Sequence, residues 1–526
     1  MWDKLEKEKK QKYQELILAF ASLTEVFAQK KEEDKAIKPI INSKFQETVF
    51  QKIFDATAED IGNTAYDASL VVTDEKDIVH KYLIGIKTFQ GSGMQKIAQF
   101  KRDSTKWAAD FQKLQLEAEK GKSVEEIVKE NKDLYLKIAH EVSRLRNLRI
   151  DSAIENLKGF RREENEVIES VYHYLMPNIK EEQPVIEVGE MSYEKIDIDN
   201  IKLLKANKKN IAQNIYFEDG KHKYRFTSAD SQLFMEFKKK SPKFEAWKVK
   251  YLDNPFRIFE KIAQDLSEIE KENLSEIKKE KIESHCWRLY VVDEEIPLFS
   301  SLNAGYALSA KNPEQRIDKF IELKNKYITE KNASFFDDVE EYLKKVKKNK
   351  NKNRKREEVD FKNRQLARKR EELMSEIKNM KDEELHIEMR NLLYRDPDEM
   401  YIAIPNSRQF HLSYPNFFSD KGILDPQNTN KVIENSFSLV FEPSGEKVEA
   451  FITQSAGKGL ETKDKQTIMG DWILRKIFQL PKYTPLTREK LEEIGINGIR
   501  LTKYHDSIHL SFIWIDDNHL PDDYWK

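Results

Sequence analysis

Two short apolar runs, each with a charged residue at one end, constrain the fold more than any other part of this chain. The first run begins directly after Asp67, and the second, Tyr82-Leu-Ile-Gly-Ile86, ends at Lys87. Apolar runs of this length between turn residues are typical of buried strands. We therefore predict neighbouring strands at residues 65–73 and 80–88, with a carboxylate at the start of one and an ammonium group at the end of the other.

The segments on either side of these strands have helical patterns. Residues 45–58 place their apolar side chains at helical spacing, and Glu47 lies near the start of that segment. After the second strand, the glycines in residues 91–93 precede a polar stretch, and we expect a helix to begin near Met94. Glycines before a helix let backbone amides approach a phosphate closely. The order helix, strand, strand, helix indicates an α/β domain.

Composition limits the class of protein. The chain has 526 residues, enough for several domains, and 35% of them are charged, but the net charge is only −2. Nucleic acid would therefore bind to local concentrations of Lys and Arg. The single cysteine, Cys286, excludes a disulfide framework. Because no run of 18 apolar residues and no signal peptide is present, we expect no membrane span and a cytoplasmic protein.

Three basic segments leave alternatives open. Residues 144–162 contain five arginines and suit either a phosphate-facing helix or a solvated helix face. Residues 214–226 predict a β-hairpin, which is either an ordinary exposed hairpin or a ribbon that enters a DNA groove. Residues 344–356 carry nine basic and no acidic side chains, and they suit a flexible loop or a non-specific phosphate contact. The basic residues of the hairpin are Lys221, Lys223 and Arg225.

After residue 397 the composition shifts toward aromatic and β-branched residues with frequent turn signals. This pattern predicts a compact barrel of short strands around two helices. The expected strands are residues 399–404, 437–442, 447–454, 498–504 and 507–514, and the expected helices are residues 467–479 and 487–494. The charged stretch before it, residues 313–395, predicts an antiparallel helical hairpin that acts as a linker or clamp.

Asp67 at the head of one strand and Lys87 on the next resemble the PD-(D/E)xK family of nucleases, in which an Asp and a (D/E)-x-K triplet lie on adjacent strands. The resemblance implies metal-assisted hydrolysis of a phosphodiester, with Mg²⁺ bound by Asp67 and by the Ile86 carbonyl. It also implies that Lys87 orients or deprotonates the attacking water. Gln95 and Lys96, just beyond the glycines, would then contact the scissile strand.

The sequence departs from this family at Gly85, where the family has its second carboxylate. Either that carboxylate has moved to a neighbouring helix, or the domain has lost its metal and only binds DNA. Glu47 is the first candidate for the moved carboxylate, followed by Glu59 and Asp103. We expect that the carboxylate has moved, because placing Lys87 at the end of an apolar run costs free energy unless the lysine has a function.

Motifs in the C-terminal part resemble the DNA-recognition pseudobarrel of some type II restriction endonucleases, a fold shared with the effector domain of EcoRII-like enzymes and the B-three domain of plant transcription factors. These motifs are residues 438–441, 449–459, 470–475 and 495–503. In such barrels two loop-and-strand arms embrace the major groove. By position, one arm would hold Asn406, Ser407, Arg408 and Gln409, and the other Gln454, Ser455, Lys458, Lys463 and Lys465. Arg and Gln suit base edges, whereas Lys mostly neutralises phosphate.

Together these resemblances predict an α+β multidomain protein. Its parts are an α/β PD-(D/E)xK-like nuclease domain at residues 1–180, an α/β middle region with the basic hairpin at 185–300, the charged helical linker or clamp at 305–395 and a β pseudobarrel at 397–526. They imply a type II restriction endonuclease that requires Mg²⁺, cuts double-stranded DNA as a homodimer and is paired with a DNA methyltransferase. Two alternatives remain: a sequence-specific DNA-binding protein without catalysis, and a nuclease that requires methylated DNA.

Overall fold

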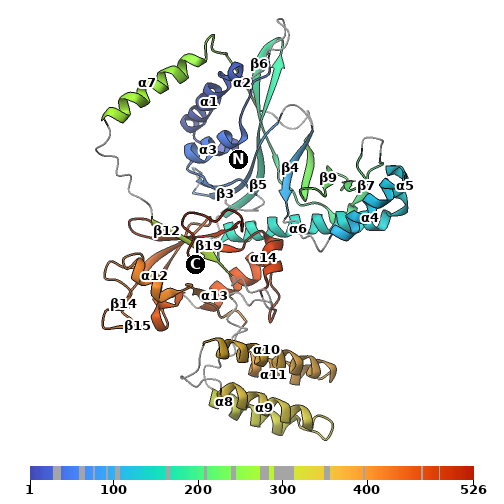
Figure 1. The fold of residues 1–526 in the computed structure, drawn as a ribbon, viewed down its shortest axis with the longest axis vertical. Helices are drawn as coiled ribbons and strands as arrows, with labels where there is room; N and C mark the ends of the chain where they lie inside the picture. The colour runs from blue at the N-terminus through green and yellow to red at the C-terminus, as the bar shows by residue number, and fades with distance from the viewer. Residues whose placement is uncertain are drawn as a thin grey trace. The chain divides into compact units, whose positions relative to one another are not determined.

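The computed structural model divides the chain into two compact units (Figure 1). Unit 1 comprises Met1–Trp287, Val440–Lys447 and Glu489–Trp525, and unit 2 comprises Arg288–Leu439, Val448–Arg488 and Lys526. The structure describes residues 1–526 except 28–36, 59–65, 75–76, 90–92, 101–106, 161–165, 207–209, 238–243, 273–282, 290–301, 303–312, 349–355, 395–396, 464–465 and 485. The residues expected to form one C-terminal barrel contribute to both units.

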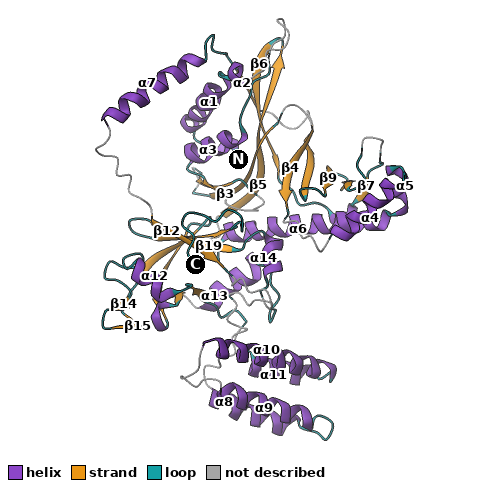
Figure 2. Ribbon diagram, viewed as in Figure 1, coloured by secondary structure: helices purple, strands orange, loops and turns teal. Residues whose placement is uncertain are grey.

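Unit 1 contains a six-stranded sheet with the order β1-β2-β3-β5-β6-β11 (Figure 2). Its strands are β1 (Thr57–Ala58), β2 (Ala68–Thr73), β3 (Val79–Thr88), β5 (Glu166–Lys180), β6 (Gln183–Ser192) and β11 (Glu245–Lys248). Neighbours are antiparallel except β3 and β5, which run parallel. A parallel pair needs a long crossover, which contains the helices α4 (Ala108–Glu119), α5 (Val124–Glu130) and α6 (Lys132–Lys158). The two predicted strands are confirmed as β2 and β3.

The two faces of this sheet belong to different cores. Helices α1 (Lys7–Ala21) and α3 (Ser43–Phe54) pack on one face, where Tyr82, Ile84 and Ile86 of β3 are buried with them. Leu83 belongs to the other core, which contains α6 and a second sheet. Because side chains alternate along a strand, Gly85 and Lys87 lie on the same face as Leu83. The short helix α2 (Thr24–Phe27) follows α1.

The helix expected from Met94 is wrong, because Gly93–Gln99 form strand β4. This strand is at one edge of a second sheet with the order β4-β10-β9-β8-β7. Met, Gln, Lys and Ala are good helix formers, but pairing with the distant strand β10 outweighs this local preference. The predicted hairpin is confirmed as β8 and β9, which pair antiparallel. The other strands of this sheet are β7 (Lys202–Leu203), β8 (Asn214–Glu218), β9 (Lys223–Thr227) and β10 (Gln232–Phe237).

Two arginines of α6 contradict both readings of the arginine-rich segment, because they are buried in unit 1. Arg146 donates to the Glu194 carbonyl at 2.8 Å. Arg149 donates to the carbonyl of Glu493 at 3.0 Å, at the C-terminal end of helix α14 (Arg488–Ile494). A cation is favourable there because the helix end carries partial negative charge. These arginines therefore hold the fold together, while residues 161–162 lie outside the described parts.

The remaining elements of unit 1 include the predicted C-terminal strands, which are confirmed as β19 (Gly498–Lys503) and β20 (Ile508–Ile513). Strand β12 (Glu283–Arg288) is the neighbour of β19. Its Cys286 is buried and donates its thiol to Asp523 Oδ1 at 3.2 Å. Helix α7 (Phe256–Glu272) precedes β12 in the chain. In the parts of the chain that the structure describes, every helix is too short or too polar to cross a bilayer.

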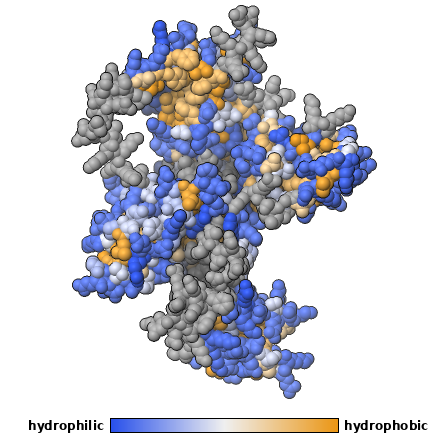
Figure 3. All heavy atoms as spheres, viewed as in Figure 1, coloured by the Kyte–Doolittle hydropathy of each residue, from blue (hydrophilic) through white to orange (hydrophobic). Residues whose placement is uncertain are grey.

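Unit 2 contains four helices where a two-helix hairpin was expected. They are α8 (Pro313–Tyr327), α9 (Ala333–Lys348), α10 (Arg356–Asn379) and α11 (Glu383–Leu393). Phe320, Phe336, Leu373 and Met389, one from each helix, share a single core. The outer surface of these helices is mainly hydrophilic, as the bottom of Figure 3 shows. The expected hairpin is therefore half of a larger helical module, and most of the basic run, residues 349–355, lies outside the described parts.

The rest of unit 2 follows the predicted order of short elements. The expected strands at residues 437–442 and 447–454 are confirmed as β16 and β17, which contribute residues to both units. The helix expected at residues 467–479 is found as α13 and a π-helix that ends at Ile477. The strand expected at 399–404 shrinks to the two residues of β13. The elements are β13 (Ile402–Ala403), α12 (Ser407–Ser413), β14 (Leu424–Asp425), β15 (Asn428–Val432), β16 (Phe437–Phe441), β17 (Glu446–Thr453), β18 (Gly459–Thr462), α13 (Gln466–Gly470) and the π-helix Asp471–Ile477.

Candidate functional site

Asp67 and Lys87 meet where strands β2 and β3 lie side by side. Asp67 immediately precedes β2, and its backbone N–H donates to the Ile84 carbonyl at 2.9 Å, which holds it against β3. Its Oδ2 accepts hydrogen bonds from the Lys87 ammonium group at 2.9 Å and from the Ile86 N–H at 2.6 Å. The side chains of Asp67 and Lys87 are 19% and 20% exposed. The pair is therefore largely enclosed but can be reached from solvent.

The charge of Lys87 follows from these surroundings. Burial lowers the pKa of its amine, but the charge and hydrogen bond of Asp67 raise it, with smaller contributions from Tyr193 and Glu47. The net effect is a pKa above the ordinary value. Lys87 is therefore protonated at neutral pH and acts as a fixed positive charge.

Glu47 approaches the pair from helix α3. Its negative charge contributes to the raised pKa of Lys87, so the two groups interact electrostatically. Its side chain is 14% exposed and forms an ion pair with Lys44 at 3.2 Å, although Lys44 is 67% exposed. The structure thus joins Asp67 and Lys87 in a hydrogen-bonded ion pair, and Glu47 of α3 adds an electrostatic interaction with Lys87.

Two glutamines attach α3 to both strands. Gln46 is fully buried, and its side-chain oxygen accepts a hydrogen bond from the hydroxyl of Thr88, the last residue of β3. Gln51 donates its side-chain amide to the Asp67 carbonyl at 3.1 Å. Glu47 lies between these anchors along the helix, so its position relative to both strands is fixed.

Sequence reasoning missed both glutamines, although Gln46 leaves a signal. It precedes Val49 and Phe50 by three and four residues and so occupies the apolar stripe of α3. A polar side chain in such a stripe is buried and needs a hydrogen-bond partner. Gln51 leaves no comparable signal, because half-buried polar residues are common on helices.

Gly85, where the family pattern has its second carboxylate, is covered by aromatic rings. A Cβ at this position would come within 2.7 Å of Cδ1 of Tyr172 and 3.1 Å of Cε2 of Tyr193. The two tyrosine rings are stacked with centroids 4.1 Å apart, and the guanidinium of Arg146 lies 4.8 Å from the Tyr193 centroid. Burial raises the pKa of Tyr172 to about 12, so it stays neutral. An acidic side chain at Gly85 has no room on this face.

Asp67 and the Ile86 carbonyl are the oxygen donors that the structure places side by side, and Glu47 is the further carboxylate that the sequence suggests. The N–H and C=O of a strand residue point to the same side, so the Ile86 carbonyl faces the side on which its N–H meets Asp67. Mg²⁺ is usually bound by one or two carboxylates and keeps several waters, so Asp67, Glu47 and this carbonyl suit it. Within the described residues, no group of three or more His, Cys, Asp or Glu side chains is placed to hold a metal. The other candidates, Glu59 and Asp103, lie outside those residues.

Gln95 and Lys96 lie on strand β4 and not at a helix N-terminus, which corrects the predicted phosphate site. They are opposite Met235 and Phe234 of β10. Lys96 is exposed and Gln95 is half-buried. Residues 90–92, which include Gly91, lie outside the described parts.

The first predicted recognition arm is the start of a helix and not a loop and strand. Asn406 precedes α12 with a left-handed φ of 45°, and Ser407 is buried. Arg408 and Gln409 are exposed. The guanidinium of Arg408 donates to the side-chain oxygen of Asn430 in β15. Sequence reasoning missed Asn430, because no local pattern connects it to Arg408.

The second predicted arm is a tight loop between β17 and β18. Gln454 has a positive φ of 68°, and both Gln454 and Lys458 are exposed. Lys463 forms an ion pair with Glu449, and this contact, together with a hydrogen bond from Ser436, lowers the pKa of the Glu449 carboxyl. Lys465 lies outside the described residues. Gln454 and Lys458 are therefore more available to a ligand than Lys463.

Two hydrogen bonds join these arms within unit 2. The ring Nε2 of His411 in α12 lies 2.9 Å from the Gly457 carbonyl, and the Ile404 N–H donates to the Lys458 carbonyl at 2.8 Å. Burial lowers the pKa of His411, so the ring is neutral and donates from Nε2. These two bonds hold the arms next to each other.

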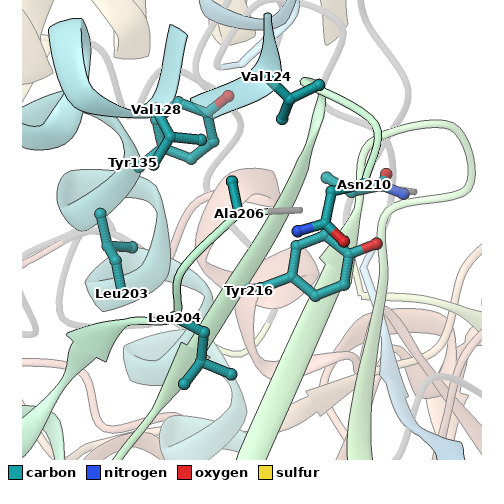
Figure 4. Close-up of a pocket in the computed structure, with 9 residues that line it drawn as sticks. Val124, Val128, Tyr135, Leu203, Leu204, Ala206, Asn210 and Tyr216 are labelled. Atoms are coloured by element: carbon teal, nitrogen blue, oxygen red, sulfur yellow. The ribbon is translucent and has the colours of Figure 1, made fainter. Parts of the chain in front are cut away.

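A separate cavity in unit 1 lies between helices α5 and α6 and the strands β7 and β8 (Figure 4). Val128, Leu204 and Tyr216 are among its lining residues. Its volume is about 10 Å³, which is room for one water molecule. This cavity is too small for a substrate.

A scan against protein-family models finds no match to this chain, and no curated protein matches its sequence.

Proposed function

We propose that the protein is a Mg²⁺-dependent endodeoxyribonuclease of the type II restriction class, which hydrolyses phosphodiesters of double-stranded DNA. The contact between Asp67 Oδ2 and Lys87 Nζ, at 2.9 Å, carries this proposal. Hydrolysis of a phosphodiester needs a carboxylate that can hold a divalent cation and a positive charge beside the phosphate. Asp67 and Lys87 supply both groups at one solvent-accessible point.

Each residue of the site has a distinct role in this proposal. Asp67, Glu47 and the Ile86 carbonyl would hold Mg²⁺, which when bound activates water and stabilises charge on the phosphate. Lys87, protonated beside Asp67, would neutralise negative charge on the phosphate and orient the water by hydrogen bonding. The raised pKa of Lys87 favours this role over proton abstraction.

The surface formed by the two arms of unit 2 would recognise the DNA sequence. Arg408, Gln409, Gln454 and Lys458 are exposed there. Arg and Gln can bond to guanine and adenine edges, and Lys can neutralise phosphate. Because each chain offers one such catalytic site, cutting both strands would require two chains, so a homodimer belongs to the proposal. Pairing with a DNA methyltransferase belongs to it as well.

Cleavage of mixed-sequence DNA with Mg²⁺ tests the catalytic part. We expect Asp67→Ala and Lys87→Ala each to lower the rate at least a hundredfold, because each removes an electrostatic group from the reacting phosphate. Lys9→Ala and Asp55→Ala are matched controls, since these residues form an exposed ion pair at 2.8 Å in the same unit. If the site variants cut like the controls, the assignment is wrong.

A second candidate is a DNA-binding protein without catalysis, and the packing at Gly85 favours it. The rings of Tyr172 and Tyr193 exclude a third acidic side chain from this face of the site. In that case the recognition surface would supply the whole function. Sequence-specific gel retardation that persists in a chelator, with no cutting in Mg²⁺ or Mn²⁺, would support this candidate over the nuclease.

A further inference from the structure

Arg408 and Asn430 form a pair on the surface of unit 2. The hydrogen bond from the Arg408 guanidinium to the Asn430 side-chain oxygen joins the start of α12 to strand β15. Both side chains are exposed. Lys431, on the same strand, has Asp425 as an ionic partner at 3.8 Å.

The backbone that carries this pair is held in place. The N–H of Asn430 donates to the side-chain oxygen of Asn428 at 3.1 Å, which shapes the hairpin. Strand β15 packs against the segment Ser455–Gly457 of the second arm, and His411 of α12 is hydrogen bonded to the same segment. Arg408 and Asn430 therefore lie on elements that are both in contact with the second arm, and the hydrogen bond to Asn430 restricts the orientation of the guanidinium.

We infer that Arg408 and Asn430 together read one guanine in the major groove, an inference that rests on the proposed recognition of DNA. A guanidinium has only N–H donors. The oxygen of Asn430 is occupied by Arg408, so its amide group presents the NH₂ donors to a ligand. The pair therefore offers more donors than acceptors, because the guanidinium and the NH₂ group only donate and a single lone pair of the Asn430 oxygen is left to accept.

A surface on which donors predominate discriminates among the bases. Guanine presents two acceptors, O6 and N7, on its major-groove edge. Adenine and cytosine each present an amino donor there, and thymine presents one acceptor beside a methyl group. Donors held in a fixed orientation therefore fit guanine and meet an unfavourable group on each of the other bases.

Selection from a random double-stranded DNA library tests this inference with the full-length protein in a chelator, which keeps the DNA intact. We expect wild type to select a site that contains a guanine, and Arg408→Ala and Asn430→Ala to lose the preference at that same base pair. Lys431→Ala, on the same strand, should select the wild-type site. Replacing that guanine by 7-deazaguanine, which lacks the N7 acceptor, should weaken binding of wild type about tenfold and should not weaken Arg408→Ala further.

Other outcomes overturn the inference in distinguishable ways. If Arg408→Ala weakens binding equally for all sequences, the arginine contacts phosphate, and the guanine assignment fails while sequence recognition stands. If the two variants change preference at different base pairs, or at none, the pair does not act as a unit. If wild type selects no sequence, the recognition function and this inference both fail. If the protein selects a DNA sequence but does not cut DNA, only the catalytic part of the proposed function fails.

Discussion

A Cβ atom at Gly85 would lie 2.7 Å from Cδ1 of Tyr172, so the tyrosine ring packs directly on the glycine backbone. Tyr172 is fully buried and stacked on Tyr193, which leaves the ring little room to move. We therefore expect Gly85→Ala to lower the free energy of unfolding by about 1–3 kcal/mol, the usual cost of overpacking. Urea unfolding would measure it. An unchanged midpoint and slope would mean that the ring moves aside freely.

In the proposed nuclease, Glu47 is the second carboxylate of the metal site. We expect Glu47→Gln, which keeps the size of the side chain, to lower cleavage by about a hundredfold or more, because it removes one charge from the metal-binding group. Titration with Mn²⁺ should show weaker binding in the same variant. Lys44→Ala, which removes the exposed partner of Glu47, is the control and should retain cleavage. If Glu47→Gln binds Mn²⁺ as tightly as wild type, another residue supplies the second carboxylate.

Asp67 should determine whether the pKa of Lys87 lies above or below its ordinary value. Burial lowers this pKa and Asp67 raises it, so Asp67→Asn should bring the pKa of Lys87 below its ordinary value, since burial then dominates. NMR titration of the lysine amine would follow this change. A pKa of Lys87 that stays high in Asp67→Asn would show that another group holds the proton.

The same shift predicts how stability depends on pH. In wild type the folded pKa of Lys87 is raised above the unfolded value of about 10.4. The stabilisation from the ion pair is therefore fully present below that unfolded pKa and is lost as pH rises through the folded pKa. Wild type should lose stability over this alkaline range more steeply than Asp67→Asn, which denaturant unfolding at a series of pH values would measure.

Local patterns predicted the part of the site that lies on β2 and β3, because an apolar run with a charged end is visible within a few residues. Strand β4 could not be predicted in this way, since its partner β10 is far away in the chain. The burial of Arg149 also has no local signature, because its partner is a backbone carbonyl in α14. The hydrogen bond between Arg408 and Asn430 depends on two separate elements that meet only in the folded unit.

Variants of Gln46 can show whether this residue positions Glu47 for catalysis or only stabilises the fold. Gln46→Leu would complete the apolar stripe of α3 and remove the hydrogen bond to Thr88. We expect its free energy of unfolding to stay within about 1 kcal/mol of wild type, as for a well-accommodated core substitution. Cleavage should fall by about ten- to a hundredfold, because small displacements of catalytic groups are costly.

Thr88→Val removes the same hydrogen bond from the strand side and should reproduce the loss of cleavage. The control is Lys52→Ala, at an exposed residue of the same helix. It should leave the free energy of unfolding and the cleavage rate unchanged. If Gln46→Leu and Thr88→Val cut DNA at the wild-type rate, the hydrogen bond between α3 and β3 does not position Glu47. If they lose stability and cleavage in proportion, the glutamine has only a structural role. A loss of cleavage at preserved stability, seen in both variants, would identify Gln46 as a positioning residue.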